Sequence, residues 1–297
     1  MRMRLITLFV TLFILAGSNV VLASEKLSVY VSIEPQRYFV QQIGKELVSV
    51  EVMVHPGASP ATYEPKPKQM ARLSRTKIYF AIGVPFERVW LPKISAANPG
   101  MVMVHTDQGV EKLTMTAHHQ HENGRHVHEE GGAAPGGDDP HIWLSPPLVK
   151  IQAGVIRTAL QSVDPTHHEV YEANYQEFVS QIGALDAKLK EILEGKQGLR
   201  FMVFHPSWGY FAKAYGLEQI PIEIEGKTPK PGQLKEMIEH AREKRIQVIF
   251  VQPQFSTKSA ALIAKAIGGQ VAFADPLASD WKANLYEVAN KFKAALR

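Results

Sequence analysis

The alternation of strand-like and helix-like segments is the feature of this sequence that most restricts its fold. Short β-branched runs alternate with amphipathic segments through the first half of the chain, and the second half repeats the pattern. The predicted strands are 27–32, 48–54, 77–82, 101–105, 200–204, 219–223, 246–252 and 270–274. Such alternation favours parallel sheets flanked by helices, so we expect an α/β protein of two lobes, each with a mainly parallel sheet.

The helices expected in the first half begin near Pro35, Pro67 and Pro85, because proline is tolerated in a first helical turn. In the second half, helices are predicted over 209–215, 231–244, 257–267 and 280–296. These segments fill the intervals between the predicted strands, as crossover connections in parallel sheets require.

Two further helices are expected between the halves. Ser145 is predicted to cap the first, and its apolar side is predicted to contain Ile151, Val155 and Ala159. Asp164 is predicted to cap the second, a long linking helix over 165–194 that spans about 45 Å at 1.5 Å per residue. Its predicted buried stripe is Phe178, Ile182, Leu185, Leu189 and Ile192. The predicted units are therefore a signal peptide (1–23), an N-terminal lobe (24–144), a helical connection (145–195) and a C-terminal lobe (196–297).

The first 23 residues have the layout of a secretory signal peptide. Arg2 and Arg4 precede an apolar stretch over 5–16, and Val21-Leu22-Ala23 forms a small-residue cleavage site. The apolar stretch is shorter than the roughly 20 residues that a membrane-spanning helix needs. We therefore expect cleavage after Ala23 and export to the periplasm.

Residue usage restricts the chemistry that the chain can carry out. The sequence contains 12 histidines and no cysteine, which excludes disulfides, thiolate metal sites, iron–sulfur clusters and a cysteine nucleophile. A formal net charge of +4 without a long basic run gives no indication of a nucleic-acid partner. Any metal must be held by imidazole and carboxylate groups.

A segment over 115–139 has no hydrophobic periodicity and is rich in histidine, glutamate and glycine. Imidazole is the commonest protein ligand of zinc and related metals, so the segment predicts contact with a divalent metal. The alternative is a solvated polar linker. The candidate auxiliary ligands are His118, His119, His121, His126 and His128.

Three further candidates are spread along the chain. His205 and Asp275 directly follow predicted strands, where open α/β sheets place their ligand-binding groups. His141 lies in the run Asp139-Pro140-His141. Taken singly, a histidine before proline is often a turn residue and an aspartate after a strand is often a helix cap.

Four segments together resemble a known family. They are Pro-Gly-Ala-Ser-Pro-Ala-Thr-Tyr-Glu-Pro (56–65), Asp-Pro-His-Ile-Trp-Leu-Ser-Pro (139–146), Phe-His-Pro-Ser-Trp-Gly-Tyr-Phe (204–211) and Asp-Pro-Leu (275–277). In this order they resemble the metal-site segments of the zinc- and manganese-binding proteins of bacterial ABC importers, the ZnuA/TroA-like family. The resemblance implies two α/β lobes joined by a long helix, with the transported metal held in the cleft between them.

The resemblance also implies a ligand set. His141, His205 and Asp275 match ligand positions, whereas Ala61 stands where the family normally has histidine. The fourth ligand is then water, Glu64 or a histidine from 118–128, and we favour the last because that segment leads into His141. A weaker site, or a partner protein that delivers metal, is the alternative. His55 and His105 match no ligand position and are expected to be loop or surface residues.

The implied function is capture of Zn²⁺ for a membrane permease whose energy comes from a separate ATPase, by a monomer without enzymatic activity. Zinc is favoured because manganese and iron members usually have glutamate where His205 stands, and imidazole suits zinc. The alternatives are a manganese- or iron-binding member of the same family, a periplasmic zinc buffer or chaperone using the histidine-rich segment, and a zinc hydrolase with Glu64 as base.

Overall fold

The computed structural model describes residues 25–115, 137–224 and 227–296. The predicted signal peptide and the histidines of 118–128 lie outside these residues. Within them, no helix is long and apolar enough to span a bilayer.

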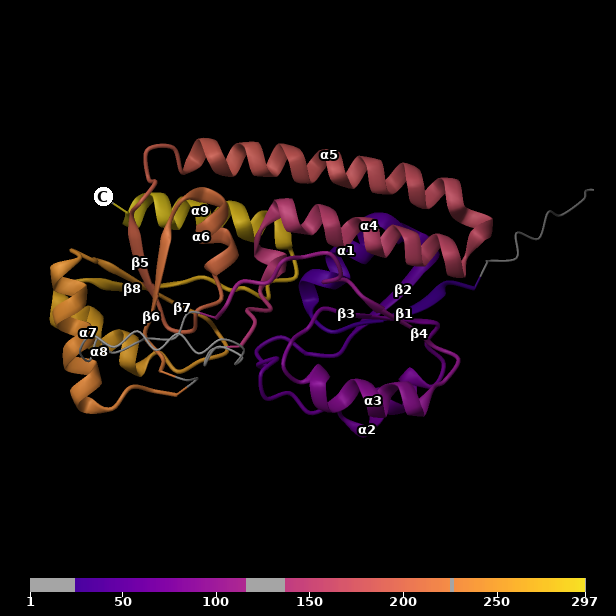
Figure 1. Cartoon of the computed structure of the whole chain (residues 1–297), viewed down its shortest axis with the longest axis horizontal. Helices are drawn as coiled ribbons and strands as arrows, with labels where there is room; N and C mark the ends of the chain where they lie inside the picture. The colour runs from indigo at the N-terminus through magenta and orange to yellow at the C-terminus, as the bar shows by residue number, and fades with distance from the viewer. Residues whose placement is uncertain (1–24, 116–136, 225–226, 297) are drawn as a thin grey trace, which may run out of the picture.

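Each half of the chain builds one parallel sheet (Figure 1). In the N-terminal lobe the strand order is β2-β1-β3-β4, and in the C-terminal lobe it is β6-β5-β7-β8. All neighbouring strands in both sheets run parallel. The strands are β1 (Leu27–Val31), β2 (Val48–Val52), β3 (Ile78–Ala81), β4 (Val102–His105), β5 (Arg200–Val203), β6 (Glu218–Pro221), β7 (Val248–Val251) and β8 (Gln270–Phe273). The predicted α/β class with two parallel sheets is confirmed.

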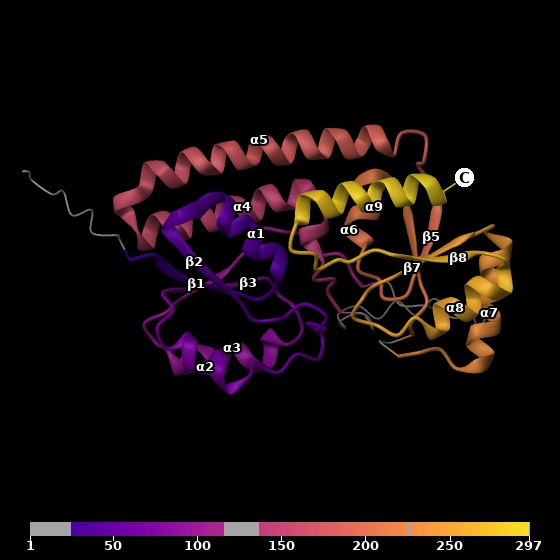
Figure 2. The same ribbon diagram turned by 180° about the vertical axis from the view of Figure 1, so that it is seen from behind.

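Helices cover the sheets and link the lobes. They are α1 (Glu34–Gly44), α2 (Pro67–Leu73), α3 (Glu87–Ala97), α4 (Pro146–Val163), α5 (His168–Ile192), α6 (Gly209–Tyr215), α7 (Pro231–Glu243), α8 (Lys258–Ile267) and α9 (Trp281–Ala295). Helix α5 runs along both lobes (Figures 1 and 2) and packs on α1 and α4 at one end and on α9 at the other.

The linking helix is shorter than the sequence predicts. A 3₁₀ turn occupies Pro165–His167, and α5 then runs for 25 residues, or about 38 Å at 1.5 Å per residue. The Asp164 carboxylate makes no backbone cap, because its Oδ2 accepts from His167 Nδ1 and Tyr171 Oη, both at 2.7 Å. The predicted stripe is buried as expected: Phe178, Ile182, Leu185, Leu189 and Ile192.

Two predictions about α4 are wrong. Ser145 stands at the N-cap position without a side-chain cap, because Pro147 has no N–H and the N–H of Leu148 donates to the Ser145 carbonyl at 2.9 Å. The predicted apolar face is also wrong, since Ile151 is 39% exposed. The buried face contains Val149, Ala153, Ile156 and Leu160. Both faces have apolar residues at helical spacing, and packing against α1 and α5 decides between them.

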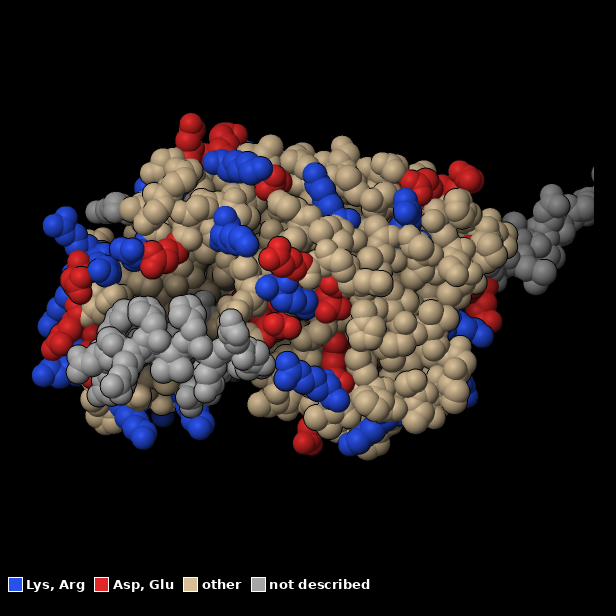
Figure 3. All heavy atoms as spheres, viewed as in Figure 1, with Lys and Arg blue, Asp and Glu red and all other residues tan. Residues whose placement is uncertain are grey.

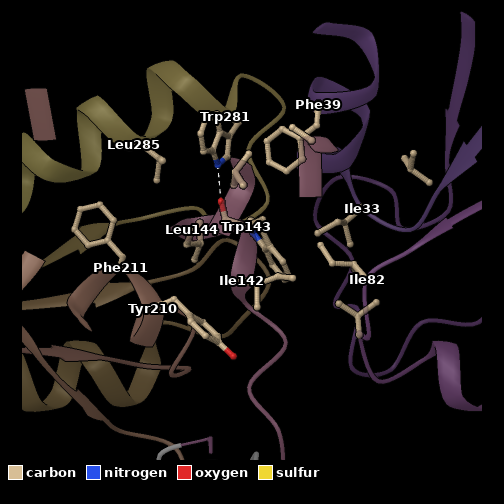
Figure 4. Close-up of a cluster of buried hydrophobic side chains, with 14 of the residues drawn as sticks. Ile33, Phe39, Ile82, Ile142, Trp143, Leu144, Tyr210, Phe211, Trp281 and Leu285 are labelled. Atoms are coloured by element: carbon tan, nitrogen blue, oxygen red, sulfur yellow. Dashed lines mark hydrogen bonds between the residues drawn. The ribbon is translucent and has the colours of Figure 1, made fainter. Parts of the chain in front are cut away.

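Aromatic side chains join the lobes beside the linking segment (Figure 4). Trp143 lies in a 3₁₀ turn (Ile142–Leu144), and its indole donates to the Pro276 carbonyl at 2.6 Å. The Trp281 indole donates to the Trp143 carbonyl at 2.6 Å, and its ring meets Phe39 of α1 edge-on with 5.1 Å between centroids. Phe39 belongs to the first lobe and Trp281 to the second, so this cluster fixes the lobes against each other next to His141.

Candidate metal centre

His141 is held by a carboxylate two residues before it. Its Nδ1 lies 2.6 Å from Asp139 Oδ1, and the same oxygen accepts from the His141 backbone N–H at 2.9 Å. Asp139 is buried, and its carbonyl accepts from Tyr210 Oη of α6 at 2.8 Å. A carboxylate only accepts hydrogen bonds, so Nδ1 carries the proton and Nε2 presents its lone pair.

His205 is held in the same way from the next strand. It follows β5, and its Nδ1 lies 2.7 Å from Oε1 of Glu223, which is buried and follows β6. Because β5 and β6 are adjacent and parallel, their carboxyl ends meet at one edge of the sheet. The imidazole stacks on Phe255 at 4.9 Å between centroids, so packing also fixes its orientation.

The structure brings these two imidazoles together. Their ring centroids lie 5.3 Å apart, at 69° between planes. Metal-binding histidines usually donate their second ring N–H to a carboxylate, which fixes the tautomer and raises the basicity of the ligand nitrogen. Two adjacent imidazoles, each with such a carboxylate, are suited to a transition metal.

Burial also keeps the His141 imidazole in the neutral state that a metal ligand needs. Removal from water lowers its pKa, and this effect outweighs the opposing effect of Asp139. The ring is therefore neutral at pH 7, as a ligand nitrogen must be.

Asp275 follows β8 at the edge of a cavity between the lobes. Its Oδ1 accepts from Gln254 Nε2 at 3.0 Å and from the Leu277 backbone N–H at 2.9 Å. In residues 25–115, 137–224 and 227–296, no group of three or more His, Asp or Glu side chains is placed to hold a metal. His141 and His205 are thus brought together, whereas Asp275 does not join them in one ligand group.

The positions around the expected fourth ligand are exposed. Ala61 and Glu64 lie in the loop between β2 and α2, and the Ala61 N–H donates to Ser59 Oγ at 3.2 Å. Among the described residues, Glu64 belongs to no group of side chains that could hold a metal ion.

The sequence alone did not identify two residues that orient the histidines, Asp139 and Glu223. Asp139 is two residues before His141, a spacing that allows one carboxylate to bind both the backbone and the ring. Glu223 lies 18 residues after His205, and only the strand order β6-β5 shows that they meet.

Comparisons with known proteins agree with this fold. The family model described as "Zinc-uptake complex component A periplasmic" matches residues 29–295. Among curated relatives, the high-affinity zinc uptake system protein ZnuA of Bacillus subtilis (strain 168) is 27% identical over 250 residues, covering 83% of this chain and 77% of that protein. The iron-binding protein YfeA of Yersinia pestis is 29% identical over 248 residues, covering 81% of this chain and 75% of that protein.

Solved structures extend the similarity to three dimensions. A crystal structure of ZnuA has a TM-score of 0.83 and 43% identity, covering 91% of this chain and 99% of that one. A zinc-bound ZnuA deletion mutant has a TM-score of 0.82 and 43% identity, covering 91% and 98%. Because the family model spans both lobes and the helices between them, this chain belongs to the ZnuA family of zinc-uptake proteins.

Proposed function

We propose that the protein captures Zn²⁺ in the cleft between its lobes and delivers it to the membrane permease of an ABC importer. The observation that carries this proposal is the pair of imidazoles, His141 and His205, each fixed through Nδ1 by a buried carboxylate. Membership of a zinc-uptake family supports the transport role.

The proposed ligands are Nε2 of His141, Nε2 of His205 and a carboxylate oxygen of Asp275. Zinc binds such nitrogen and oxygen ligands at about 2.0–2.2 Å. The proposed units remain an N-terminal lobe (24–144), a helical connection (145–195) and a C-terminal lobe (196–297). His141 lies near the end of the first unit and the other two ligands belong to the last unit, so a bound ion would connect these two units.

Zinc is the proposed metal rather than manganese or iron, because two imidazoles give a nitrogen-rich ligand set. Because one relative is an iron-binding protein, the choice of zinc needs an experimental test. Competition between Zn²⁺ and Mn²⁺ for the purified protein should strongly favour zinc, and equal affinity would overturn the metal assignment.

The protein is proposed to act as a periplasmic, non-enzymatic monomer, with a separate ATPase supplying energy through the permease. Nothing in the proposed ligand set requires a chemical step, since capture and release need only a change in coordination.

Zinc titration of the wild type and His205→Ala tests the binding step. We expect tight binding in the wild type and a loss of at least tenfold in the variant, the scale of a disturbed metal site. Equal affinities would overturn the proposed site.

The histidine-rich segment favours one alternative, a periplasmic zinc buffer or chaperone. Zinc uptake by a strain lacking the gene separates the two functions. Reduced uptake that the wild-type gene restores supports the importer, whereas unchanged uptake with a lowered periplasmic zinc content supports the buffer.

A further inference from the structure

A cavity of about 370 Å³ separates the lobes next to Asp275. Its polar lining comes from both lobes: Glu34 and His55 from the first, and Gln254, Asp275, Ser279, Asp280, Asn284 and Glu287 from the second. No lysine or arginine is among its lining residues, although basic and acidic side chains are interspersed over the face drawn in Figure 3. Such a lining favours a cation.

Three of the four lining carboxylates already have partners. Glu34 is buried and lies 2.6 Å from Arg37, Glu287 lies 2.6 Å from Lys291, and Asp280 caps α9 by accepting from the Ala283 N–H at 3.0 Å.

Asp275 differs from these carboxylates. Both of its hydrogen bonds go to Oδ1, and within the described residues its Oδ2 has none. The carboxylate is therefore anchored through one oxygen and keeps the other available for a metal.

His55 faces the same cavity from the N-terminal lobe and has a fixed backbone. It follows β2 directly after Val54, whose N–H donates to the Ser32 carbonyl at 3.0 Å. The His55 carbonyl accepts from the Ala58 N–H at 3.0 Å. The turn is thus held on both sides.

The His55 imidazole lies near Glu34, whose pKa burial raises, while Arg37 and His55 oppose that rise. The imidazole is exposed, and its ring nitrogens make no hydrogen bond to another described residue. Its one aromatic neighbour among the described rings is Tyr63, edge-on at 6.4 Å between centroids. It can therefore reorient towards a metal without breaking an existing bond.

We propose that His55 becomes the fourth zinc ligand when the ion draws it and Asp275 towards His141 and His205, because among the described residues these side chains do not yet form one group. The Ala61 side chain has no donor atom, and His55 lines the same cavity as the proposed ligand Asp275. The proposal rests on the proposed function. It completes a tetrahedral set of three imidazoles and one carboxylate, and it adds a second ligand from the N-terminal lobe beside His141.

The test measures zinc affinity, by competition with a chelator, for the wild type, His55→Ala, His105→Ala and the double variant His55→Ala/Ala61→His. His105 is also an exposed histidine, the last residue of β4, and serves as the control. We expect at least tenfold weaker binding in His55→Ala and wild-type affinity in His105→Ala. The double variant should regain affinity, because an imidazole returns to the same coordination sphere.

Cobalt supplies a readout of coordination itself. The visible bands of bound Co²⁺ depend on its ligand atoms and geometry, so exchange of the His55 nitrogen for water in His55→Ala should shift these bands, and the double variant should restore them. Circular dichroism of each metal-free variant checks that it is folded.

Two outcomes would overturn the role of His55: wild-type affinity in His55→Ala, or equal losses in His55→Ala and His105→Ala. In the first case, loss of the tight site on deletion of 118–128 would place the fourth ligand in that segment. The proposed function fails separately, if the wild type does not bind zinc or if His205→Ala binds it equally well.

Discussion

Asp139 and Glu223 determine how the two neighbouring histidines are presented. Each is buried and binds Nδ1 of its histidine at 2.6 or 2.7 Å, distances typical of strong charge-assisted hydrogen bonds. With both Nδ1 atoms occupied, the metal-binding edge of each ring is its Nε2 edge.

Replacing Glu223 should weaken zinc binding without removing a ligand. We expect Glu223→Gln to lose about 10- to 100-fold in zinc affinity, because the amide no longer attracts the Nδ1 proton as a carboxylate does. Calorimetric titration measures the change. The control is Glu218→Gln on β6, whose carboxylate forms an exposed pair with Arg200 at 2.6 Å. Equal affinities in the two variants would contradict a positioning role for Glu223.

Burial of His141 makes the stability of the metal-free protein depend on pH. Its folded-state pKa is lowered from 6.5, so the unfolded chain binds more protons as the pH falls below that value. The contribution of His141 to the free energy of unfolding is fully present above pH 6.5 and is lost as the pH falls through the lowered pKa. Urea unfolding between pH 5 and 8 should show a shallower pH dependence for His141→Gln than for the wild type. Identical slopes would show that His141 does not contribute.

Among the secondary-structure elements, the eight strands are those that the sequence predicts best. Each observed boundary falls within two residues of the predicted one, because short β-branched runs between helices have little alternative to a buried parallel sheet. The face of α4 was mispredicted because two apolar faces compete, and contacts with α1 and α5, distant in sequence, choose between them.

The sequence predicted only part of the candidate site. Local pattern made His205 and Asp275 candidates, and the resemblance to a known family suggested their ligand roles. Glu223 pairs with His205 only through strand order, and the proposed role of His55 depends on which loops face each other across the cavity, so neither residue had a local signal.

Helix α5 should derive its stability from its buried stripe. Leu185→Ala removes a fully buried side chain and should cost about 2–5 kcal/mol in the free energy of unfolding. Val170→Ala on the same helix changes a side chain that is 43% exposed and should stay within about 0.5 kcal/mol. Denaturant unfolding of both variants measures the difference, and similar losses would contradict the assigned buried face.

At the scale of the whole molecule, the proposed ion connects two lobes that also meet through α5, the Trp143–Trp281 cluster and the hydrogen bond from Tyr210 to the Asp139 carbonyl. A ligand that binds only the folded state stabilises it by about 2.7 kcal/mol at 100 times its Kd. Zinc should therefore raise the Tm, and a chelator should reverse the increase. In His205→Ala the same zinc concentration should have a smaller effect, and an equal increase would place the stabilising ion elsewhere.

Zinc affinity should also fall at acid pH. Unperturbed histidine has a pKa near 6.5, and protonated imidazole does not bind metal. Because burial lowers the pKa of His141, this ligand should keep its zinc to a lower pH than an exposed histidine would. Calorimetric titrations from pH 8 to 5 test this, and unchanged affinity at pH 5 would count against histidine ligation.

Anomalous diffraction at the zinc absorption edge, from crystals of the zinc-loaded protein, tests the central claim most directly. We expect one strong peak between the lobes, about 2.0–2.2 Å from Nε2 of His141, Nε2 of His205 and a carboxylate oxygen of Asp275. A peak that these three side chains do not share, or no peak in the cleft, would contradict it.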